Sequence, residues 1–390
     1  MSFDSFGDDS IDNEPVKISV FSNNESNKNI VPPKISSSSA VVMDRLSGRV
    51  LYEKGAFIRR PMASTTKIMT AILALEKGKP LDIITVSERA ARVGGSNIHL
   101  KKNEKICLND LLYGLMLSSG NDAAIAISEY IGGTVEKFAV MMTNKAHDIG
   151  AKDSAFKTPH GLDKDGHYST AYDLAIMANY ALKNKKFSQI VSTRKAVISN
   201  DRNLTNTNEM LSVYPGANGV KTGFTGKAGR CLVTSAARNG WQIISVVLGS
   251  ASRHMRASDS TRILNYAFNN YEMFNLNNLS KNELSVKVSK GKNPLIVIKY
   301  DGEGFYPLRK DEISTLKASY NIPKTIEAPL KKGALIGNIV YSSNGSTIKS
   351  INVSLNQDIE RKSVVNFYND IIKYWLTKTA QEFNDSLIKL

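Results

Sequence analysis

The stretch from Pro61 to Ala71, PMASTTKIMTA, places Ser64 three residues before Lys67 at the start of an apolar run. On a helix, residues three apart share a face, with about 5 to 6 Å between their Cβ atoms, so the lysine amine can reach the serine hydroxyl. A serine hydroxyl becomes a strong nucleophile only when a base takes its proton. The two residues are therefore a candidate nucleophile and general base, although a serine at a helix start can also serve only as a cap.

This spacing recurs in the chain, since a lysine also lies three residues after Ser154, Ser192, Ser289, Ser314 and Ser346. What distinguishes Ser64 is its place at a helix start, where free backbone N–H groups point towards a developing anion. A lysine acts as a base only while it is uncharged, and both burial and a second nearby cation lower the pKa of its amine. Lys221 is a candidate for that second cation.

Two further triplets follow in order, Ser119-Gly120-Asn121 and Lys221-Thr222-Gly223. Together with Ser64-x-x-Lys67 they resemble the active-site motifs of penicillin-binding proteins. Within that superfamily the chain is most similar to the low-molecular-weight D-alanyl-D-alanine carboxypeptidases, which have Ser-Gly-Asn where class A β-lactamases have Ser-Asp-Asn. The segments HGLD, HYSTAYDLA and GVKTGFTGKAG agree as well. The resemblance covers residues 39–275 in detail and the region after them more loosely.

The resemblance implies a role for each motif residue. It makes Ser64 the acylated nucleophile and Lys67 its base. Ser119 would relay a proton towards the leaving amine, and Asn121 would hold the substrate backbone. Lys221 would tune the electrostatics of the site.

The same resemblance implies a pocket for the terminal carboxylate of the substrate. Thr222 and Thr225 would donate hydrogen bonds to it, and Arg256 would lie near it. Gly223 belongs to the same substrate-binding strand. The backbone amides of Ser64 and Phe224 would form the oxyanion hole, and the Phe224 ring would stand at the rim of the cleft.

The implied activity is removal of the terminal D-alanine from peptidoglycan stem pentapeptides through an acyl-enzyme on Ser64, outside the bacterial membrane. β-Lactam antibiotics would acylate the same serine, and neither a metal nor an organic cofactor is implied. An endopeptidase acting on cross-linked peptidoglycan and a non-catalytic wall- or membrane-binding protein remain as alternatives. A β-lactamase is disfavoured, because the deacylation pattern Glu-x-x-x-Asn does not occur between Asn121 and Lys221. A metal site built on His160, His167 and His254 is also disfavoured, because their spacing does not fit a ligand set.

The chain has 390 residues and a net charge of +15, which suits an anionic environment such as an acidic membrane face or wall polymer. Its lysines are scattered, and no aromatic-and-basic motif of a nucleic-acid-binding fold is present, so nucleic acid is not an expected partner. The first residues, MSFDSFGDDSIDNEP, do not have the charge and apolar pattern of a secretory signal. Because the chemistry points outside the cytoplasm, we interpret the sequence as a mature or trimmed form of an exported protein.

Apolar periodicity and turn residues predict helices and β-hairpins, followed by the short strands of a small all-β domain. The resemblance implies an α/β (α+β) fold for the catalytic domain, of the β-lactamase/transpeptidase type, with an antiparallel sheet flanked by helices. The sheet combines a hairpin over residues 40–55 with two strands, GRCLVTSAAR and WQIISVVLGSA, joined at Asn239-Gly240. Lys221-Thr222-Gly223 is expected at the leading edge of the first of these strands. The predicted divisions are a flexible leader over 1–38, a catalytic domain over 39–275, a β-rich domain over 276–361 and an amphipathic helix over 362–390.

The predicted C-terminal helix carries large apolar residues at helical spacing: Val364, Tyr368, Ile371, Ile372, Trp375, Phe383 and Leu387. This stripe could pack on the β-rich domain, or it could lie in a membrane interface. Members of the family often attach themselves through such a tail, which favours contact with a membrane surface. The chain has no run of about 18 apolar residues that would predict a spanning helix.

Overall fold

The computed structural model describes residues 31–279, 283–299 and 304–387, and the chain divides after Tyr271 into two compact units. The first unit contains all the predicted catalytic residues. The division falls at the start of strand β10 (Tyr271–Asn275), whereas the predicted boundary lay at the end of that strand. Each unit has its own hydrophobic core.

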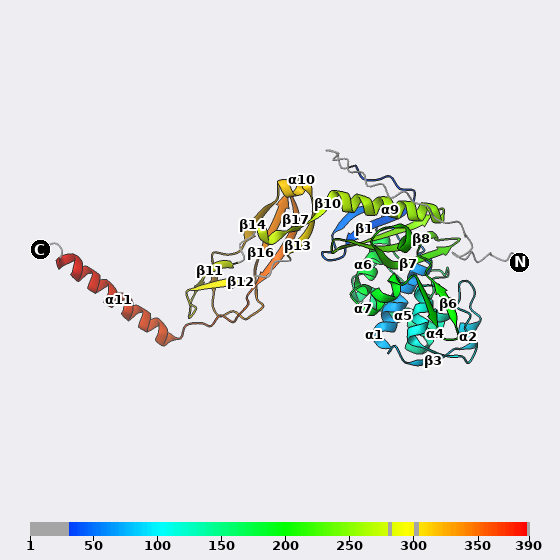
Figure 1. The fold of residues 1–390 in the computed structure, drawn as a ribbon. Coiled ribbons are helices and arrows are strands. Elements are labelled where there is room, and N and C mark those ends of the chain that lie inside the picture. Colours follow the sequence, from blue (N-terminus) through cyan, green and yellow to red (C-terminus); the bar gives the residue numbers. More distant parts are fainter. Residues whose placement is uncertain (1–30, 280–282, 300–303, 388–390) are drawn as a thin grey trace. The chain divides into compact units, whose positions relative to one another are not determined.

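A five-stranded antiparallel sheet with the order β2-β1-β9-β8-β7 forms the centre of the first unit (Figure 1). Its strands are β1 (Ser39–Asp44), β2 (Val50–Lys54), β7 (Ala217–Thr225), β8 (Gly229–Arg238) and β9 (Trp241–Ser250). The predicted hairpins are confirmed, and both Asn239 and Gly240 have the positive φ angles, 50° and 80°, that a tight hairpin turn requires.

One prediction about the sheet was wrong. The Lys221-Thr222-Gly223 triplet does not lead into strand β8 but lies within a strand of its own, β7, at the edge of the sheet. The alternation of apolar and polar residues that marks a strand is weak here, because Gly219 and Gly223 occupy two of its positions. Of the strands that the structure describes, only β8 pairs with β7.

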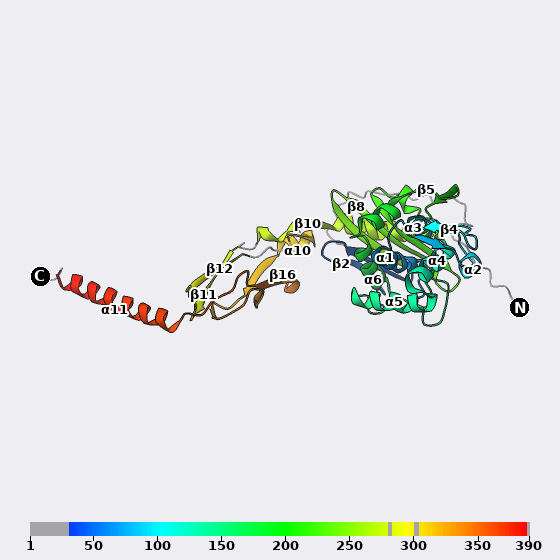
Figure 2. The same cartoon turned by 90° about the horizontal axis from the view of Figure 1, so that it is seen from below.

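Helices cover both faces of the sheet. The long helix α9 (Arg253–Asn270) packs on one face, where Ile263 and Leu264 meet Leu232 and Val247 of the strands. On the other face α1 (Lys67–Lys77) and α6 (Ala171–Ala181) share a core with the alternate strand residues, and Figure 2 shows these helices in front of the strands. Helix α1 is buried from Lys67 to Ala74.

The remaining helical elements complete the first unit around α1. The longer ones are α3 (Leu108–Met116), α4 (Asn121–Gly132), α5 (Val135–Asp148) and α7 (Lys185–Ser192). The shorter ones are η1 (Ala63–Thr66), α2 (Glu88–Ala91) and α8 (Met210–Val213). Two small hairpins pair β3 (Ile83–Thr85) with β4 (Lys105–Cys107) and β5 (Lys195–Ile198) with β6 (Arg202–Thr205).

The predicted flexible leader is corrected at its C-terminal end. Most of it, residues 1–30, lies outside the described residues. Immediately before β1, however, the backbone N–H and hydroxyl groups of Ser36 and Ser37 all donate to one carboxylate oxygen of Asp259 on α9, at 2.7 to 3.0 Å. Ser37 is fully buried. The prediction of a flexible leader rested on its small number of large apolar residues. It therefore missed that hydrogen bonds hold Ser36 and Ser37 in place.

The second unit is built from short strands, as predicted. These are β10, β11 (Glu283–Ser289), β12 (Leu295–Lys299), β13 (Phe305–Arg309), β14 (Lys317–Asn321), β15 (Thr325–Glu327), β16 (Leu335–Ser343) and β17 (Ser346–Ser354). Among the described residues of this unit they form one two-stranded and two three-stranded sheets, accompanied by η2 (Leu276–Asn278) and α10 (Lys310–Ser314). Ile298, Leu308, Ile339, Tyr341 and Val353 are buried in its core.

The predicted C-terminal helix is present as α11 (Val364–Leu387). Its large apolar side chains are exposed over the part whose side chains are described; Tyr368 is 66% and Trp375 69% accessible. Packing of this stripe into the core of the β-rich unit is therefore not observed. Phe383 and Leu387 belong to the part of α11 whose side chains are not described. Within the described residues, every helix is too short or too polar to cross a bilayer.

Candidate active site

Ser64 lies in the single 3₁₀ turn η1, and Lys67 is the first residue of α1. The cap positions of these two elements belong to Met62 and Thr66, so Ser64 does not have the capping role that was its structural alternative. The residue before it, Ala63, has a left-handed φ of 47°. Such a conformation costs a non-glycine residue roughly 1 to 2 kcal/mol, which the surrounding packing must offset.

The Lys67 amine is the centre of the site. Its Nζ lies 2.8 Å from Ser64 Oγ, 2.7 Å from Asn121 Oδ1 and 2.8 Å from the backbone carbonyl of His160. The side chain is completely buried, and these three partners are all uncharged. At this distance Nζ can accept the Ser64 proton as soon as the amine has a free lone pair.

The Ser119-Gly120-Asn121 motif connects α3 to α4 and presents Asn121 to the lysine. The Asn121 amide group is fixed at its other end, where Nδ2 donates to the carbonyl of Gly94 at 2.7 Å. The Asn121 backbone N–H donates to the carbonyl of Ser96, also at 2.7 Å. Ser119 has a φ of 60° and is only 5% accessible, so a second left-handed residue lies at the site.

The HGLD segment packs against the turn that contains Ser64. Gly161 has a φ of 93°, and a Cβ at this position would lie 2.0 Å from the carbonyl oxygen of Ala63. Only glycine permits this approach, and the approach places the neighbouring His160 carbonyl on Lys67. The segment matched the family motifs in the sequence, but its structural role could not be inferred there.

Gly223 brings strand β7 against the same turn. A Cβ at Gly223 would lie 2.8 Å from the backbone nitrogen of Ser64 and 3.0 Å from that of Thr65. Lys221, two residues earlier, is 1% accessible, and its amine donates to the carbonyl of Thr222 at 3.1 Å. The first and third motifs are therefore in contact, although 157 residues (221 − 64) separate Ser64 from Lys221 in the chain.

The side chains after Lys221 face partners that the sequence did not reveal. The Thr222 and Thr207 hydroxyl oxygens lie 2.6 Å apart. Thr225 donates to Asp163 Oδ1 at 3.0 Å and accepts from the backbone N–H of Ala228. The Arg230 guanidinium lies over the Phe224 ring, 4.3 Å from its centroid.

Arg256, which the resemblance implied to lie near the carboxylate pocket, is held by a neighbouring carboxylate. Its guanidinium is fully buried and donates to both carboxylate oxygens of Glu209, at 2.8 to 3.1 Å. Arg253 is a second cation near the same carboxylate, at 3.9 Å.

Two buried histidines border the site, and both are hydrogen-bonded. His160 Nδ1 accepts from the N–H of Leu162, and His167 Nδ1 accepts from the N–H of Lys157. Burial, reinforced by the charge of Lys67, lowers the pKa of His160 to about 3. Burial, with a smaller contribution from Lys157, lowers the pKa of His167 to about 4. Both rings are therefore neutral near pH 7, and His167 is left with an Nε2–H that can donate to Thr66 at 2.9 Å.

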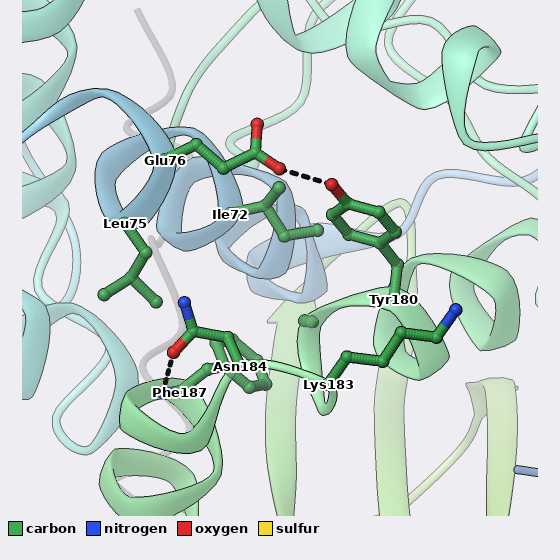
Figure 3. Close-up of a pocket in the computed structure, with 8 residues that line it drawn as sticks. Ile72, Leu75, Glu76, Tyr180, Lys183, Asn184 and Phe187 are labelled. Carbon is green, nitrogen blue, oxygen red and sulfur yellow. Dashed lines mark hydrogen bonds between the residues drawn. The ribbon is translucent and has the colours of Figure 1, made fainter.

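No metal centre is found in the part of the chain that the structure describes, because its His, Cys, Asp and Glu residues form no group of three able to hold an ion. A separate cavity of about 330 Å³ lies between α1, α6 and α7, and Figure 3 shows Ile72 and Leu75 facing Tyr180 and Phe187 across it. Ser64 and Lys67 are not among the residues that line it. This cavity is therefore distinct from the active site.

The site contains a buried lysine that is hydrogen-bonded to a serine, and it lies next to an edge strand with further hydroxyl groups. This arrangement is typical of serine acyl-transfer enzymes. The antiparallel sheet with helices on both faces is the fold of the β-lactamase and transpeptidase superfamily.

Comparison with known proteins defines the family more closely. Residues 26–252 match the family described as D-alanyl-D-alanine carboxypeptidase, and residues 271–361 match the C-terminal domain of penicillin-binding protein 5. The chain is 36% identical to D-alanyl-D-alanine carboxypeptidase DacF of Bacillus subtilis (strain 168) over 348 residues, which are 86% of this chain and 89% of that protein. It is 31% identical to DacA of Escherichia coli (strain K12) over 362 residues, 89% of each chain.

The similarity extends to solved structures. The crystal structure of penicillin binding protein 5 from Haemophilus influenzae superposes with a TM-score of 0.79 at 31% identity, covering 85% of this chain and 100% of that one. The protein therefore belongs to the D-alanyl-D-alanine carboxypeptidase family, whose members are serine enzymes that form acyl-enzymes and bind penicillin. The family, fold and enzymatic activity expected from the sequence are confirmed.

The low pKa values of His160 and His167 predict a specific loss of stability in mild acid. The unfolded chain binds a proton on each histidine below its ordinary pKa of about 6.5, and the folded chain does not do so until about pH 4 or 3. Each histidine therefore contributes stability above pH 6.5 that is lost as the pH falls, at up to about 1.4 kcal/mol per pH unit.

Urea unfolding between pH 6.5 and 5 would measure this slope. In the His167→Gln variant we expect the pH dependence of the free energy of unfolding to decrease by the contribution of one histidine. This change does not depend on the stability of the variant at pH 7. The exposed His254 provides the matched control, His254→Gln, which should retain the wild-type slope. Equal slopes in all three proteins would contradict the assignment of a neutral, buried His167.

Proposed function

We propose that Ser64 and Lys67 perform the acyl transfer, and that the reaction removes the terminal D-alanine from peptidoglycan stem pentapeptides. The observation that carries this proposal is the 2.8 Å contact between the buried Lys67 amine and the Ser64 hydroxyl. Lys67 takes the proton as Ser64 Oγ attacks the peptide carbonyl. The proton passes through Ser119 to the leaving nitrogen, the C–N bond breaks, and D-alanine departs.

A water molecule then hydrolyses the ester, with Lys67 again as the base, and Ser64 is restored. The developing oxyanion accepts hydrogen bonds from the backbone N–H groups of Ser64 and Phe224. The close approach of Gly223 to the Ser64 nitrogen supports this assignment, because Phe224 directly follows Gly223. Lys221 contributes positive charge to the site.

The substrate backbone lies along β7, which is an edge strand of the sheet among the described residues, and an extended peptide can add to such an edge. Asn121 contacts that backbone from the opposite wall. The terminal carboxylate is received by the hydroxyl of Thr222, with Thr225 beside it and the Arg256–Glu209 pair beneath. Because its substrate is part of the cell wall, we place the protein outside the cytoplasm.

We also propose that α11 attaches the protein to a membrane surface. Ile371, Ile372 and Trp375 are among its exposed apolar residues, and the chain carries a net charge of +15. An amphipathic helix with exposed aromatic and aliphatic groups binds in the interface of an anionic bilayer.

Intact-mass spectrometry after penicillin treatment tests the catalytic assignment. We expect one long-lived covalent adduct on the wild-type protein and none on Ser64→Ala, because that variant has no nucleophile. Release of D-alanine from a pentapeptide should disappear in the same variant. An adduct on Ser64→Ala would contradict the assignment, and rapid turnover of the wild-type adduct would favour a β-lactamase. Hydrolysis rates of the pentapeptide and of a cross-linked muropeptide dimer show whether carboxypeptidase or endopeptidase activity is the greater.

Sedimentation with phosphatidylglycerol-containing vesicles tests the role of α11 in the 390-residue protein. Charged residues at Ile371 and Trp375 should weaken binding by at least tenfold, since burial of each apolar side chain contributes about 1.5 to 3 kcal/mol. The double variant Ile371→Glu/Trp375→Glu is compared with Val140→Glu, which alters an apolar side chain on α5 that is 60% accessible. Equal binding of both variants would refute the membrane role of this helix.

A further inference from the structure

The two threonines of the proposed carboxylate pocket differ in where their hydroxyl protons point. Thr225 directs its proton to the Asp163 carboxylate and receives the N–H of Ala228 on the same oxygen. Its hydroxyl is thus occupied on both sides. Thr222 has a different partner, the Thr207 hydroxyl at 2.6 Å, and either oxygen of that pair could be the donor. Recognition of a carboxylate in this arrangement depends on Thr222.

The number of protons on the Thr207 and Thr222 hydroxyls determines which of the two donates to the other when substrate is bound. An ionised carboxylate can only accept hydrogen bonds, and each threonine hydroxyl has a single proton. If Thr222 donates to Thr207, it has no proton left for the substrate. If Thr207 donates to Thr222, the Thr222 proton is free to point at the carboxylate. The second direction also strengthens the outer bond, because successive hydrogen bonds polarise one another.

We propose that Thr207 is a positioning residue that donates to Thr222 and so makes the enzyme selective for a free terminal carboxylate. The proposal rests on the role proposed above for Thr222. Thr207 does not touch the substrate; it acts by fixing the direction in which the Thr222 hydroxyl points.

The backbone around Thr207 is held firmly enough for this role. The Thr207 N–H donates to the carbonyl of Leu117 at 3.1 Å, which ties it to the end of α3 just before the Ser119 motif. Asn206 donates from its backbone to the carbonyl of Arg194 at 2.8 Å and from its side chain to that of Thr193 at 2.9 Å. Asn206 also accepts the N–H of Asn208 at 3.0 Å.

The segment is fixed on its other side as well. Glu209, two residues after Thr207, holds the buried guanidinium of Arg256. Arg256 in turn lies 3.5 Å from the carbonyl of Cys231, which pairs with Gly223 across the sheet. Residues 206–209 therefore connect the second motif to the third, and Thr207 is the member of this segment whose hydroxyl meets the substrate strand.

The experiment compares two peptides that differ only at the end, one with a free D-alanine carboxylate and one with the D-alanine amide. The variant Thr207→Val removes the hydroxyl and keeps the shape, whereas Thr207→Ser keeps the hydroxyl. We expect Thr207→Val to lower kcat/KM for the carboxylate peptide by about tenfold, the effect of one charge-assisted hydrogen bond. The amide peptide should change by less than about twofold, and Thr207→Ser should retain the wild-type preference.

The ratio of kcat/KM for the two peptides separates this role from a structural one, because general damage lowers both values together. An equal fall for both peptides, or no change in either, would overturn the proposal. If Thr207→Val does not fold, Thr207→Ala deletes the same hydroxyl and is measured in its place. Thr222→Val tests the proposed role of Thr222 in binding the carboxylate. If this variant leaves the ratio of kcat/KM values unchanged, the carboxylate pocket itself is wrongly placed. If Thr222→Val removes the preference and Thr207→Val does not, only the inference about Thr207 fails.

Discussion

The hydrogen bond between Lys67 and Ser64 is the interaction on which the rest of the site depends. Serine attacks only if its proton is removed, and a lysine removes it only while uncharged. The Lys67 side chain is completely buried. Its amine contacts the Ser64 hydroxyl, the Asn121 side-chain oxygen and the His160 carbonyl, and none of these three groups is a carboxylate that would stabilise a charged amine. Each of the surrounding elements delivers one of these partners: α4 brings Asn121, and the HGLD segment brings the His160 carbonyl.

The second constraint is how closely the chain must approach the Ser64 turn. Gly161 and Gly223 press against this turn from two directions, and at both positions a Cβ would lie 2.8 Å or less from backbone atoms of the turn. The left-handed residues Ala63 and Ser119 add strain next to the reacting groups. Strain of this kind persists where the surrounding structure is over-determined, and here α1 is buried over its first eight residues.

Much of the fold followed from the sequence, because local patterns determine it. Turn residues and apolar periodicity predicted the β1–β2 and β8–β9 hairpins, helix α1 and the strands of the second unit. The three catalytic motifs were recognised from their resemblance to a known family. Strand β7 was not predicted as a separate strand, since two glycines replace the side chains that would have revealed it.

Contacts between distant segments leave no such local pattern. The Thr207–Thr222 pair, the Asp163–Thr225 bond and the Glu209–Arg256 pair each join polar residues that are ordinary in their own sequence surroundings. The anchoring of Ser36 and Ser37 on Asp259 could not be predicted for the same reason. These contacts orient the motif residues. The sequence therefore revealed the motif residues but not the contacts that hold them in position.

The most direct test of the central claim is the rate at which penicillin acylates Ser64 in the Lys67→Arg variant. A guanidinium stays protonated at every pH at which the protein is folded, so it can still donate hydrogen bonds but cannot act as a base. We expect acylation to fall by at least about a thousandfold while the variant remains folded, in keeping with the loss of a general base. Acylation within about tenfold of the wild-type rate, a loss smaller than general-base catalysis contributes, would contradict it and show that the buried amine of Lys67 is not what activates the serine.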